Sequence, residues 1–588
     1  MVLETALRVG IVVVLAVVLA FVWYFDGRGR WWELLTDRFV LGVPWGSVVS
    51  ILLVLLVYLF VQSGIENWQD PAVLPFRSWS YSYVLGMLAA GFTHAGPGHF
   101  LGNTLATLVL APLVEYAWGH YPLSARRTDQ PDTGYDHPPP AAPSEADRAA
   151  ATGKHNTDGD PSNTDGGADG ASAGAGESGD SAGLFARPLA RAFVIFPLAL
   201  VALSVVTSVL ARGWSLGYSG TVFFLLGVAV VLVPLATVVG MVALTGVNVL
   251  FSALQTPILQ VTTGTGPPGP PSWAGINVQA HLVGFLLGVL VAFALLRRRD
   301  RWPDVGRLAL AVVLVVLSRG LWSYATSSGS TYTRWQGIGV IFVLFLAAVI
   351  VAMVAVDDRR LFGSVTLRGV VVGGIVAITL LIALSSVPPN IVGMDDDPVP
   401  DTGTITVQDY TVTYAEDVPH GRVDFNSSGV IVVSEQRDIW SRVVQPSQLA
   451  HSGEATATVG GVGWREVVTV ERSGWQVLGN DTVYAVALEH DDRRVEAFQS
   501  DPKRADAHIA GHAVTVVAGP GEFRLRITHD NETVGETVVP DTNETLTVDL
   551  VSSAAVEELT VTTTDRDGDR RIVVEHGNTR VPVAEAEN

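Results

Sequence analysis

The feature that most constrains this chain is a series of long apolar blocks that contain no charged residue. Residues 48–61, 193–210 and 340–356 are examples. A hydrocarbon core about 30 Å thick is crossed by roughly 20 apolar residues in a helix. Because no water is present there to bond the backbone, such blocks must be helical. The sequence therefore predicts a polytopic α-helical membrane protein.

Ten candidate spans follow from this pattern. The first is interpreted as a retained helix rather than a cleaved signal peptide, because Glu4 lies near its start and no small-residue cleavage site precedes Phe25. The predicted spans are 5–24, 45–62, 97–118, 188–211, 217–233, 235–256, 278–296, 305–323, 335–356 and 366–387.

Charge is concentrated in the C-terminal part of the chain. Residues 388–588 hold 35 acidic and 15 basic residues, a difference that equals the net charge of −20 of the whole chain. An acidic surface with only two lysines, Lys154 and Lys503, suits a salt-adapted protein, because salt screens self-repulsion. The acidity argues against nucleic acid as a partner. The absence of cysteine excludes disulfides and thiolate chemistry.

Two segments differ in pattern from the spans. Residues 121–186 contain a stretch made almost entirely of Gly, Ala, Ser, Asp, Asn and Thr, which cannot bury enough apolar area to fold. We interpret them as a disordered cytoplasmic linker, either a plain insertion or a tether. From about residue 400, short β-branched runs alternate with turn signals. This pattern predicts that 388–588 forms an acidic, antiparallel β-rich domain with one or two sandwich-like units.

The placement of arginine predicts the orientation in the membrane. Arginines cluster in or beside alternate loops, as at 126–127 and 297–299, and the positive-inside rule puts these loops in the cytoplasm. With ten spans, both termini then lie outside the cell, and the β-rich domain is extracellular. Glycosylation sequons agree with this orientation; they begin at Asn426, Asn480, Asn531 and Asn543.

Polar residues inside membrane spans are costly, so they are candidates for function. His94, His99 and Asn103 lie at the outer entrance of the third span, and His99 and Asn103 share one helix face because they are four residues apart. They could donate hydrogen bonds to a developing oxyanion. Helix capping and hydrogen bonding between helices are the alternative.

A second group, Gly217-Tyr218-Ser219-Gly220, opens the fifth span. Small neighbours leave the Ser219 hydroxyl open to a substrate, and they let backbone N–H groups near a helix start approach an anion. Small residues also permit close helix packing, so this motif alone is a weak signal.

The third group surrounds His281, near the outer start of the seventh span. Gly284 and Gly288 form a small-residue face that admits another helix, which could carry Ser219. His281 could then accept the serine proton and return it to a leaving amine; a structural histidine is the alternative. The spans carrying Asn103, Ser219 and His281 all run from outside to inside, so the three groups are predicted to lie at one depth.

Taken together, these motifs resemble the rhomboid family of intramembrane serine proteases. The family pattern H-x4-H-x3-N, G-x-S-G and A-H-x2-G-x3-G is matched in that order at 94–103, 217–220 and 280–288. The resemblance covers about 45–296, six spans that it implies form a protease core interrupted by the linker. An extra helix and cytoplasmic loop in 1–44 and three extra helices in 297–387 lie outside it.

The resemblance also implies roles. Ser219 would be the nucleophile and His281 the general base and acid, with an oxyanion hole formed by His99, Asn103 and the backbone N–H of Ser219. Neither metal nor cofactor is implied. The implied substrates are transmembrane proteins in the lipid bilayer of the cell membrane, cleaved near the outer face. Accessory positions are His94, Gly217, Tyr218, Gly220 and Gly284, and Tyr218 could either help to shape the substrate cavity or simply pack.

One departure concerns the first outer loop. Many members of the family carry a Trp-Arg pair shortly before the histidine motif, where this chain has Leu85-Gly86. Trp79 lies further upstream, with Arg77 before it rather than after it. The conformation of this loop is therefore left open. The roles of the extra helices and of the β-rich tail, which could contact substrates or a surface layer, are also left open.

Two other classes of function are compatible with a multi-span chain. A catalytically silent rhomboid-like protein that binds client transmembrane helices usually lacks the serine or the histidine, and both are present here. A transporter or channel would carry charges in mid-span and internal repeats. The sequence shows no internal repeat between its halves, and its few span charges, such as Arg8, Glu115 and Arg319, lie towards span ends.

Overall fold

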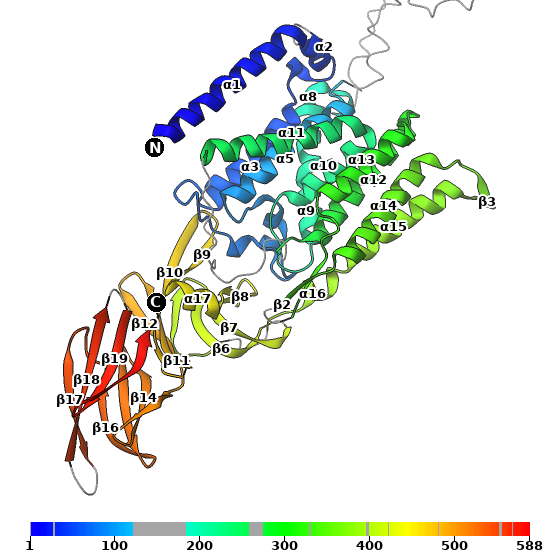
Figure 1. The fold of residues 1–588 in the computed structure, drawn as a ribbon. Coiled ribbons are helices and arrows are strands. Elements are labelled where there is room, and N and C mark those ends of the chain that lie inside the picture. Colours follow the sequence, from blue (N-terminus) through cyan, green and yellow to red (C-terminus); the bar gives the residue numbers. More distant parts are fainter. Residues whose placement is uncertain are drawn as a thin grey trace, which may run out of the picture.

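The computed structural model describes residues 2–26, 30–121, 184–257, 275–328, 331–394, 399–421, 423–479, 481–551, 556–566 and 569–587. Helices dominate up to residue 391 and strands from residue 404 onward, so the chain forms a helical bundle followed by a β-region (Figure 1). The predicted linker at 121–186 lies outside the described residues except at its two ends. The predicted glycosylation position Asn480 also lies outside them.

Each of the ten predicted spans contains a helix. Among the described residues, six helical segments are long and apolar enough to cross a membrane, whereas α3 with η2, α10 and α13 are shorter apolar helices. The helices are α1 (Val2–Asp26), α3 (Trp45–Leu56) continued by η2 (Val57–Val61), α5 (Pro97–Trp118), α8 (Pro188–Ala190) continued by η6 (Arg191–Ile195) and α9 (Phe196–Val209), α10 (Ser219–Leu232), α11 (Pro234–Gln255), α12 (Val278–Arg299), α13 (Val305–Ser318), α14 (Gln336–Ala355), and α15 (Leu367–Leu384) followed by α16 (Val387–Ile391).

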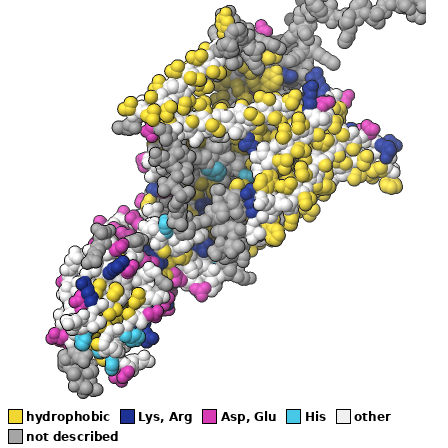
Figure 2. All heavy atoms as spheres, in the orientation of Figure 1, with side chains coloured by type: hydrophobic (Ala, Val, Ile, Leu, Met, Phe, Trp, Pro, Cys, Tyr) yellow, Lys and Arg dark blue, Asp and Glu magenta, His cyan; other side chains and the backbone are white. Residues whose placement is uncertain are grey.

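The outer faces of these helices are apolar. Val242, Ile341 and Leu381 are each more than two-thirds exposed, at 68%, 72% and 71%. Figure 2 shows hydrophobic side chains over the visible face of the bundle, with charged groups gathered at its ends and over the β-region. An apolar surface of this extent is suited to lipid rather than water. The chain is therefore a multi-pass membrane protein.

Helix α10 occupies the centre of the bundle. Every residue from 220 to 231 is buried, and α10 contacts α5, α9, α11, α12 and α13. Its 14 residues span about 21 Å, whereas the 22 residues of α5 or α12 span about 33 Å. Since α10 is too short to run the full depth of the bundle, there is room for a cavity beyond its N-terminal end.

The β-region contains three main antiparallel sheets. One four-stranded sheet is formed by β5 (Thr404–Val407), β6 (Tyr410–His420), β7 (Val423–Ser434) and β8 (Ile439–Val444). An eight-stranded sheet combines β9 (Glu454–Gly461), β10 (Trp464–Val477), β11 (Asp481–His490), β12 (Arg493–Gln499), β17 (Thr545–Val551), β18 (Val556–Arg566), β19 (Asp569–His576) and β20 (Thr579–Ala586). The last sheet contains β13 (Lys503–Ile509), β14 (His512–Gly519), β15 (Glu522–His529) and β16 (Glu532–Val538).

Two large hydrophobic cores lie in the β-region, beside a smaller cluster around Trp440. The first includes Tyr410, Val432 and Val470, and the second includes Val477, Val514 and Ile572. Strand β10 contributes Val470 to the first core and Val477 to the second, so one long strand belongs to both. The predicted β-rich C-terminal region is confirmed, and it contains two sandwich-like cores joined through a shared sheet.

The loop between η2 and α5, residues 62–96, joins the bundle to the β-region. Its side chains Leu74, Trp79 and Tyr83 are part of the first β-core. The Ser82 hydroxyl donates to Asp438 Oδ2 at 2.7 Å, and the Thr458 hydroxyl donates to Asp70 Oδ2 at 2.9 Å. This loop, named the outer loop after its predicted position, is therefore held by residues of the β-region that lie more than 300 residues later in the chain.

Candidate active site

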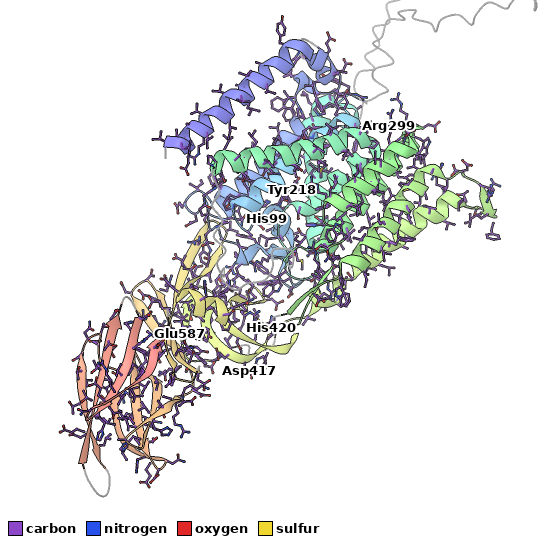
Figure 3. All side chains as sticks on the ribbon, in the orientation of Figure 1. His99, Tyr218, Arg299, Asp417, His420 and Glu587 are labelled. Atoms are coloured by element: carbon purple, nitrogen blue, oxygen red, sulfur yellow. The ribbon has the colours of Figure 1, made fainter. Side chains whose placement is uncertain are left out.

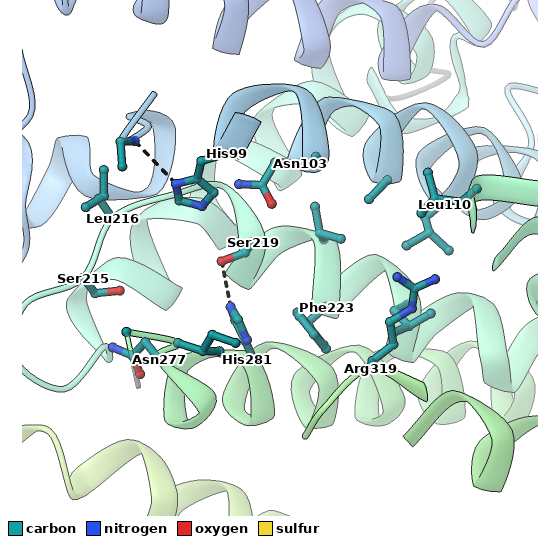
Figure 4. A pocket seen from close by; sticks show the side chains of 18 of the residues that line it. His99, Asn103, Leu110, Ser215, Leu216, Ser219, Phe223, Asn277, His281 and Arg319 are labelled. Atoms are coloured by element: carbon teal, nitrogen blue, oxygen red, sulfur yellow. Dashed lines mark hydrogen bonds between the residues drawn. The ribbon is translucent and has the colours of Figure 1, made fainter. Parts of the chain in front are cut away.

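The structure brings Ser219 and His281 together. Ser219 is the first residue of α10 and His281 lies in the first turn of α12. The Oγ atom of Ser219 lies 2.8 Å from Nε2 of His281, at hydrogen-bonding distance (Figure 4). The two side chains come from separate helices, so this geometry depends on how closely α10 and α12 approach.

Three glycines permit that approach. A β-carbon at Gly284 would lie 2.3 Å from the carbonyl oxygen of Gly220, and one at Gly288 would lie 2.2 Å from that of Phe224. From the other side, a β-carbon at Gly227 would lie 2.1 Å from the carbonyl oxygen of Phe285. The predicted small-residue face at 284 and 288 is confirmed: it packs backbone against backbone on the helix that begins with Ser219.

The imidazole of His281 is held flat against an aromatic ring. Its centroid lies 4.3 Å from that of Phe223, with 15° between the ring planes. The start of α12 is fixed by Asn277, whose side chain accepts from the Ala280 backbone N–H at 3.1 Å and donates to the Arg212 carbonyl at 3.2 Å. Neither Asn277 nor Phe223 was singled out from the sequence, because neither belongs to a catalytic residue pattern.

His99 and Asn103 approach the nucleophile from α5. Gly217 has φ +115°, and a β-carbon there would lie 2.6 Å from His99 Nε2 and 3.4 Å from Asn103 Nδ2. Both side chains thus lie against the backbone just before Ser219. The Ala95 backbone N–H donates to His99 Nδ1 at 3.4 Å, which leaves the proton of the neutral ring on Nε2.

The Asn103 amide is poised to donate. Its Nδ2 atom is buried and has no hydrogen-bond partner among the described residues. Burying an amide without a partner costs free energy, which selection retains mainly where the group binds something else. Nδ2 of Asn103, Nε2 of His99 and the backbone N–H of Ser219 can therefore serve as donors to a single oxyanion.

Two predicted accessory residues lie away from the cavity. Tyr218 is 2% exposed and its ring lies 6.4 Å from that of Phe92, so it packs into the bundle rather than shaping the substrate cavity. His94 is fully buried beneath His99, with ring centroids 5.1 Å apart. The side chain of Gln62 accepts from the His94 backbone N–H and donates to its carbonyl, which places His94 as a support for His99.

A cavity of about 510 Å³ contains the Ser219 and His281 side chains. Trp214 lines it, and Trp79 and Arg77 of the outer loop pack against the Trp214 ring at 5.3 Å and 6.0 Å. No aspartate or glutamate is among the described residues that line it, and none of the described residues form a cluster that could hold a metal ion. The cavity therefore offers a serine, a histidine beside it and the imidazole and amide N–H groups of His99 and Asn103.

The two ends of the bundle differ in charge. At one end, Arg191 Nη2 donates to the Gly119 carbonyl at 2.8 Å and Arg299 Nη1 donates to the Ala117 carbonyl at 2.7 Å. Ser219 and His281 lie towards the opposite end, where the β-region docks. In Figure 3, Arg299 lies far from the β-region, and His99 and Tyr218 lie between the two.

A comparison with protein families bears on this site. Residues 188–298 match the family model described as the Rhomboid domain. No curated protein and no solved structure matches the chain. The matched segment carries both Ser219 and His281. It overlaps the C-terminal part of the predicted core of 45–296, while the motif of His94, His99 and Asn103 precedes it. Residues 188–298 are therefore similar to the rhomboid domain, which supports a rhomboid family protein.

Proposed function

We propose that this protein is an intramembrane serine endopeptidase in which Ser219 is the nucleophile and His281 the general base and acid. The observation that carries the proposal is the 2.8 Å separation of Ser219 Oγ and His281 Nε2 inside a cavity enclosed by membrane helices. A serine is activated when an adjacent base can take its proton. Because the described cavity wall has no carboxylate to orient the imidazole, stacking on Phe223 fulfils that function.

The chemistry follows from these positions. Ser219 Oγ attacks the scissile carbonyl carbon while His281 Nε2 takes the hydroxyl proton. The oxyanion accepts hydrogen bonds from Asn103, His99 and the Ser219 backbone N–H. The carbon–nitrogen bond then breaks as His281 returns the proton to the leaving nitrogen. A water, deprotonated by His281, attacks the resulting ester, and the proton restores the Ser219 hydroxyl as the acid product leaves.

The proposed substrates are transmembrane proteins, cleaved near the outer face of the cell membrane. The arginine-bearing end of the bundle would face the cytoplasm by the positive-inside rule, which places the β-region and the catalytic end outside. In that position the β-region could contact substrates or a surface layer. Its acidic surface supports salt adaptation, so we expect activity to rise with KCl concentration.

Labelling with a fluorophosphonate probe tests the dyad. The probe should label the wild-type protein in membranes, and labelling should be lost in Ser219→Ala and His281→Ala. Ser385→Ala is the matched control, because Ser385 is exposed and its hydroxyl bonds only to the Ile382 carbonyl of its own helix. A wild-type protein that is folded, stays unlabelled and leaves a transmembrane reporter intact would contradict the proposal. That outcome would favour a catalytically silent protein that binds client transmembrane helices.

A further inference from the structure

The cavity that holds the dyad also contains a cation from outside the matched rhomboid segment. Arg319 directly follows α13, one of the extra helices, and its side chain lines the cavity. In Figure 4 it lies beyond Phe223 as seen from Ser219, on the side of Leu110. The surrounding wall is apolar, and is formed by Leu110, Phe223, Leu226, Met241 and Leu244.

The partly buried guanidinium of Arg319 has few acceptors among the described residues. Its Nε atom is buried without a hydrogen-bond partner, and Nη2 contacts only the sulfur of Met241, at 3.4 Å. It forms no ion pair within the described part of the chain, and no described carboxylate lines the cavity. A guanidinium carries five N–H donors, and a thioether is a weak acceptor. Leaving such a cation uncompensated in an apolar site is costly.

Two other arginines of the bundle have guanidinium groups whose N–H donors are hydrogen-bonded. Arg191 donates to the Gly119 carbonyl just after α5, and Arg299 donates to the Ala117 carbonyl in the last turn of α5. Arg319 is itself next to the C-terminal carbonyls of α13, yet its side chain turns into the cavity instead. The orientation towards the dyad is therefore a property of this side chain that helix capping does not explain.

We propose that Arg319 is a substrate subsite that binds a carboxylate, the side chain of an aspartate or glutamate in the segment being cleaved. A guanidinium pairs with a carboxylate through two parallel hydrogen bonds, which the empty donors of Arg319 can supply. This inference rests on the proposed protease function, because the same cavity would hold the scissile bond at Ser219. It makes one of the extra helices a determinant of substrate choice.

The position of the subsite sets the spacing of the acidic residue. Leu226 and Arg319 both line the cavity, and Leu226 follows Ser219 by seven residues on α10, which corresponds to about 10 Å along the helix. An extended chain advances about 3.3 Å per residue. The acidic residue should therefore lie about three residues from the cleaved bond, on the side that continues into the membrane.

A pair of reporters tests the subsite. Each has one Leu/Ala transmembrane segment with either Asp or Asn at one of the five positions on the embedded side of the cleaved bond. At the matching position, the wild type should cleave the Asp reporter with a kcat/KM about tenfold higher than the Asn reporter. Arg319→Gln should cleave both equally, and Arg319→Glu should prefer a Lys reporter. Arg334→Gln is the control, because Arg334 stacks on Trp322 and does not line the cavity.

The outcomes separate the subsite from the protease function. If the ratio of kcat/KM for the Asp reporter to that for the Asn reporter is equal in wild type and Arg319→Gln, the subsite is overturned. Cleavage of the Asn reporter would still support the protease function. If the wild type cleaves no reporter, binding of the same peptides to Ser219→Ala decides the matter. Tighter binding of the Asp peptide that disappears in Ser219→Ala/Arg319→Gln supports the subsite, and equal binding overturns it. An anionic phospholipid retained by wild type and lost in Arg319→Gln, with equal peptide binding, would assign the cation to a lipid phosphate and overturn the proposal.

Discussion

Gly284 of α12 faces Gly220 of α10 so closely that a β-carbon on Gly284 would lie 2.3 Å from the Gly220 carbonyl oxygen. Gly220 directly follows the proposed nucleophile, and Gly284 lies three residues after the proposed base. The distance between Ser219 and His281 is therefore set by a backbone contact rather than by adjustable side chains. A site built in this way should tolerate no added atom at that contact.

We predict that Gly284→Ala reduces kcat by about a hundredfold, because displacing the helices by about 1 Å separates nucleophile from base. The variant should remain folded, since overpacking typically costs about 1 to 3 kcal/mol. Kinetics on a transmembrane reporter and a thermal unfolding curve measure both effects. Gly246→Ala is the matched control: it lies in α11, and nothing would meet its added β-carbon within 4 Å. Normal activity of Gly284→Ala would show that the helix contact does not set the geometry of the dyad.

Substitutions at Gly217 and Gly213 distinguish the effect of a side-chain collision on activity from the effect of backbone strain. Its φ of +115° is unfavourable for any other residue, and a β-carbon there would collide with His99 at 2.6 Å. Gly217→Ala should therefore displace an oxyanion donor and lower kcat by about a hundredfold. Gly213, in the same loop, has φ +63° but open space around it, so Gly213→Ala tests backbone strain alone and should keep most activity. Equal losses in both variants would attribute the effect to strain.

Much of the candidate site can be predicted from the sequence because the patterns that mark its residues are short and local. Ser219 and His281 lie in the first turn of apolar helices, where a polar residue stands out against its neighbours. Gly284 and Gly288 indicate the face on which another helix packs, and the alternation of spans predicts the common depth. The position of the Tyr218 side chain is harder to predict: Tyr218 precedes the first residue of α10, so being next to Ser219 in sequence does not place its ring in the cavity.

Other features could not be predicted because they depend on contacts far apart in the sequence. Arg319 lies towards the end of a predicted span, where an arginine usually reaches water. Only the packing of α13 against α10 and α11 turns it into the cavity. Trp79 and Tyr83 similarly gave no signal of docking, since their partners belong to strands more than 300 residues later.

The amide of Asn103 should contribute to activity but not to stability. Removing one oxyanion donor costs about 10² to 10³ in kcat. Because Nδ2 has no hydrogen-bond partner among the described residues, Asn103→Ala removes no hydrogen bond of that atom, and the free energy of unfolding should not fall. Steady-state kinetics should show the loss in kcat rather than in KM. Asn67→Ala in the outer loop is the control, and a large loss of stability in Asn103→Ala would assign this side chain a structural role instead.

The dock between the β-region and the outer loop centres on Asp409 and Arg437. The Asp409 carboxylate accepts from Arg437 Nε at 2.6 Å, from Arg437 Nη2 at 3.0 Å and from the Ser434 hydroxyl at 2.6 Å. Arg437 Nη1 also donates to the Tyr83 hydroxyl of the outer loop, at 3.4 Å. Partial burial raises the pKa of the Asp409 carboxyl, but the hydrogen bonds from Arg437 and Ser434 outweigh it, so the pKa is lowered overall.

A lowered pKa in the folded state gives a stability contribution that is complete above the unfolded value of about 3.9 and is lost as pH falls through the folded value. We therefore predict that the dock is insensitive to pH near neutrality and weakens only in acid. Asp409→Asn should weaken it by about 2 kcal/mol at neutral pH. Fluorescence of the buried Trp79 reports the change. Glu471→Gln is the control, because Glu471 pairs with Arg494 on the exposed surface, where ion pairs contribute little. If Asp409→Asn and Glu471→Gln have the same acid midpoint as the wild type, Asp409 does not hold the dock.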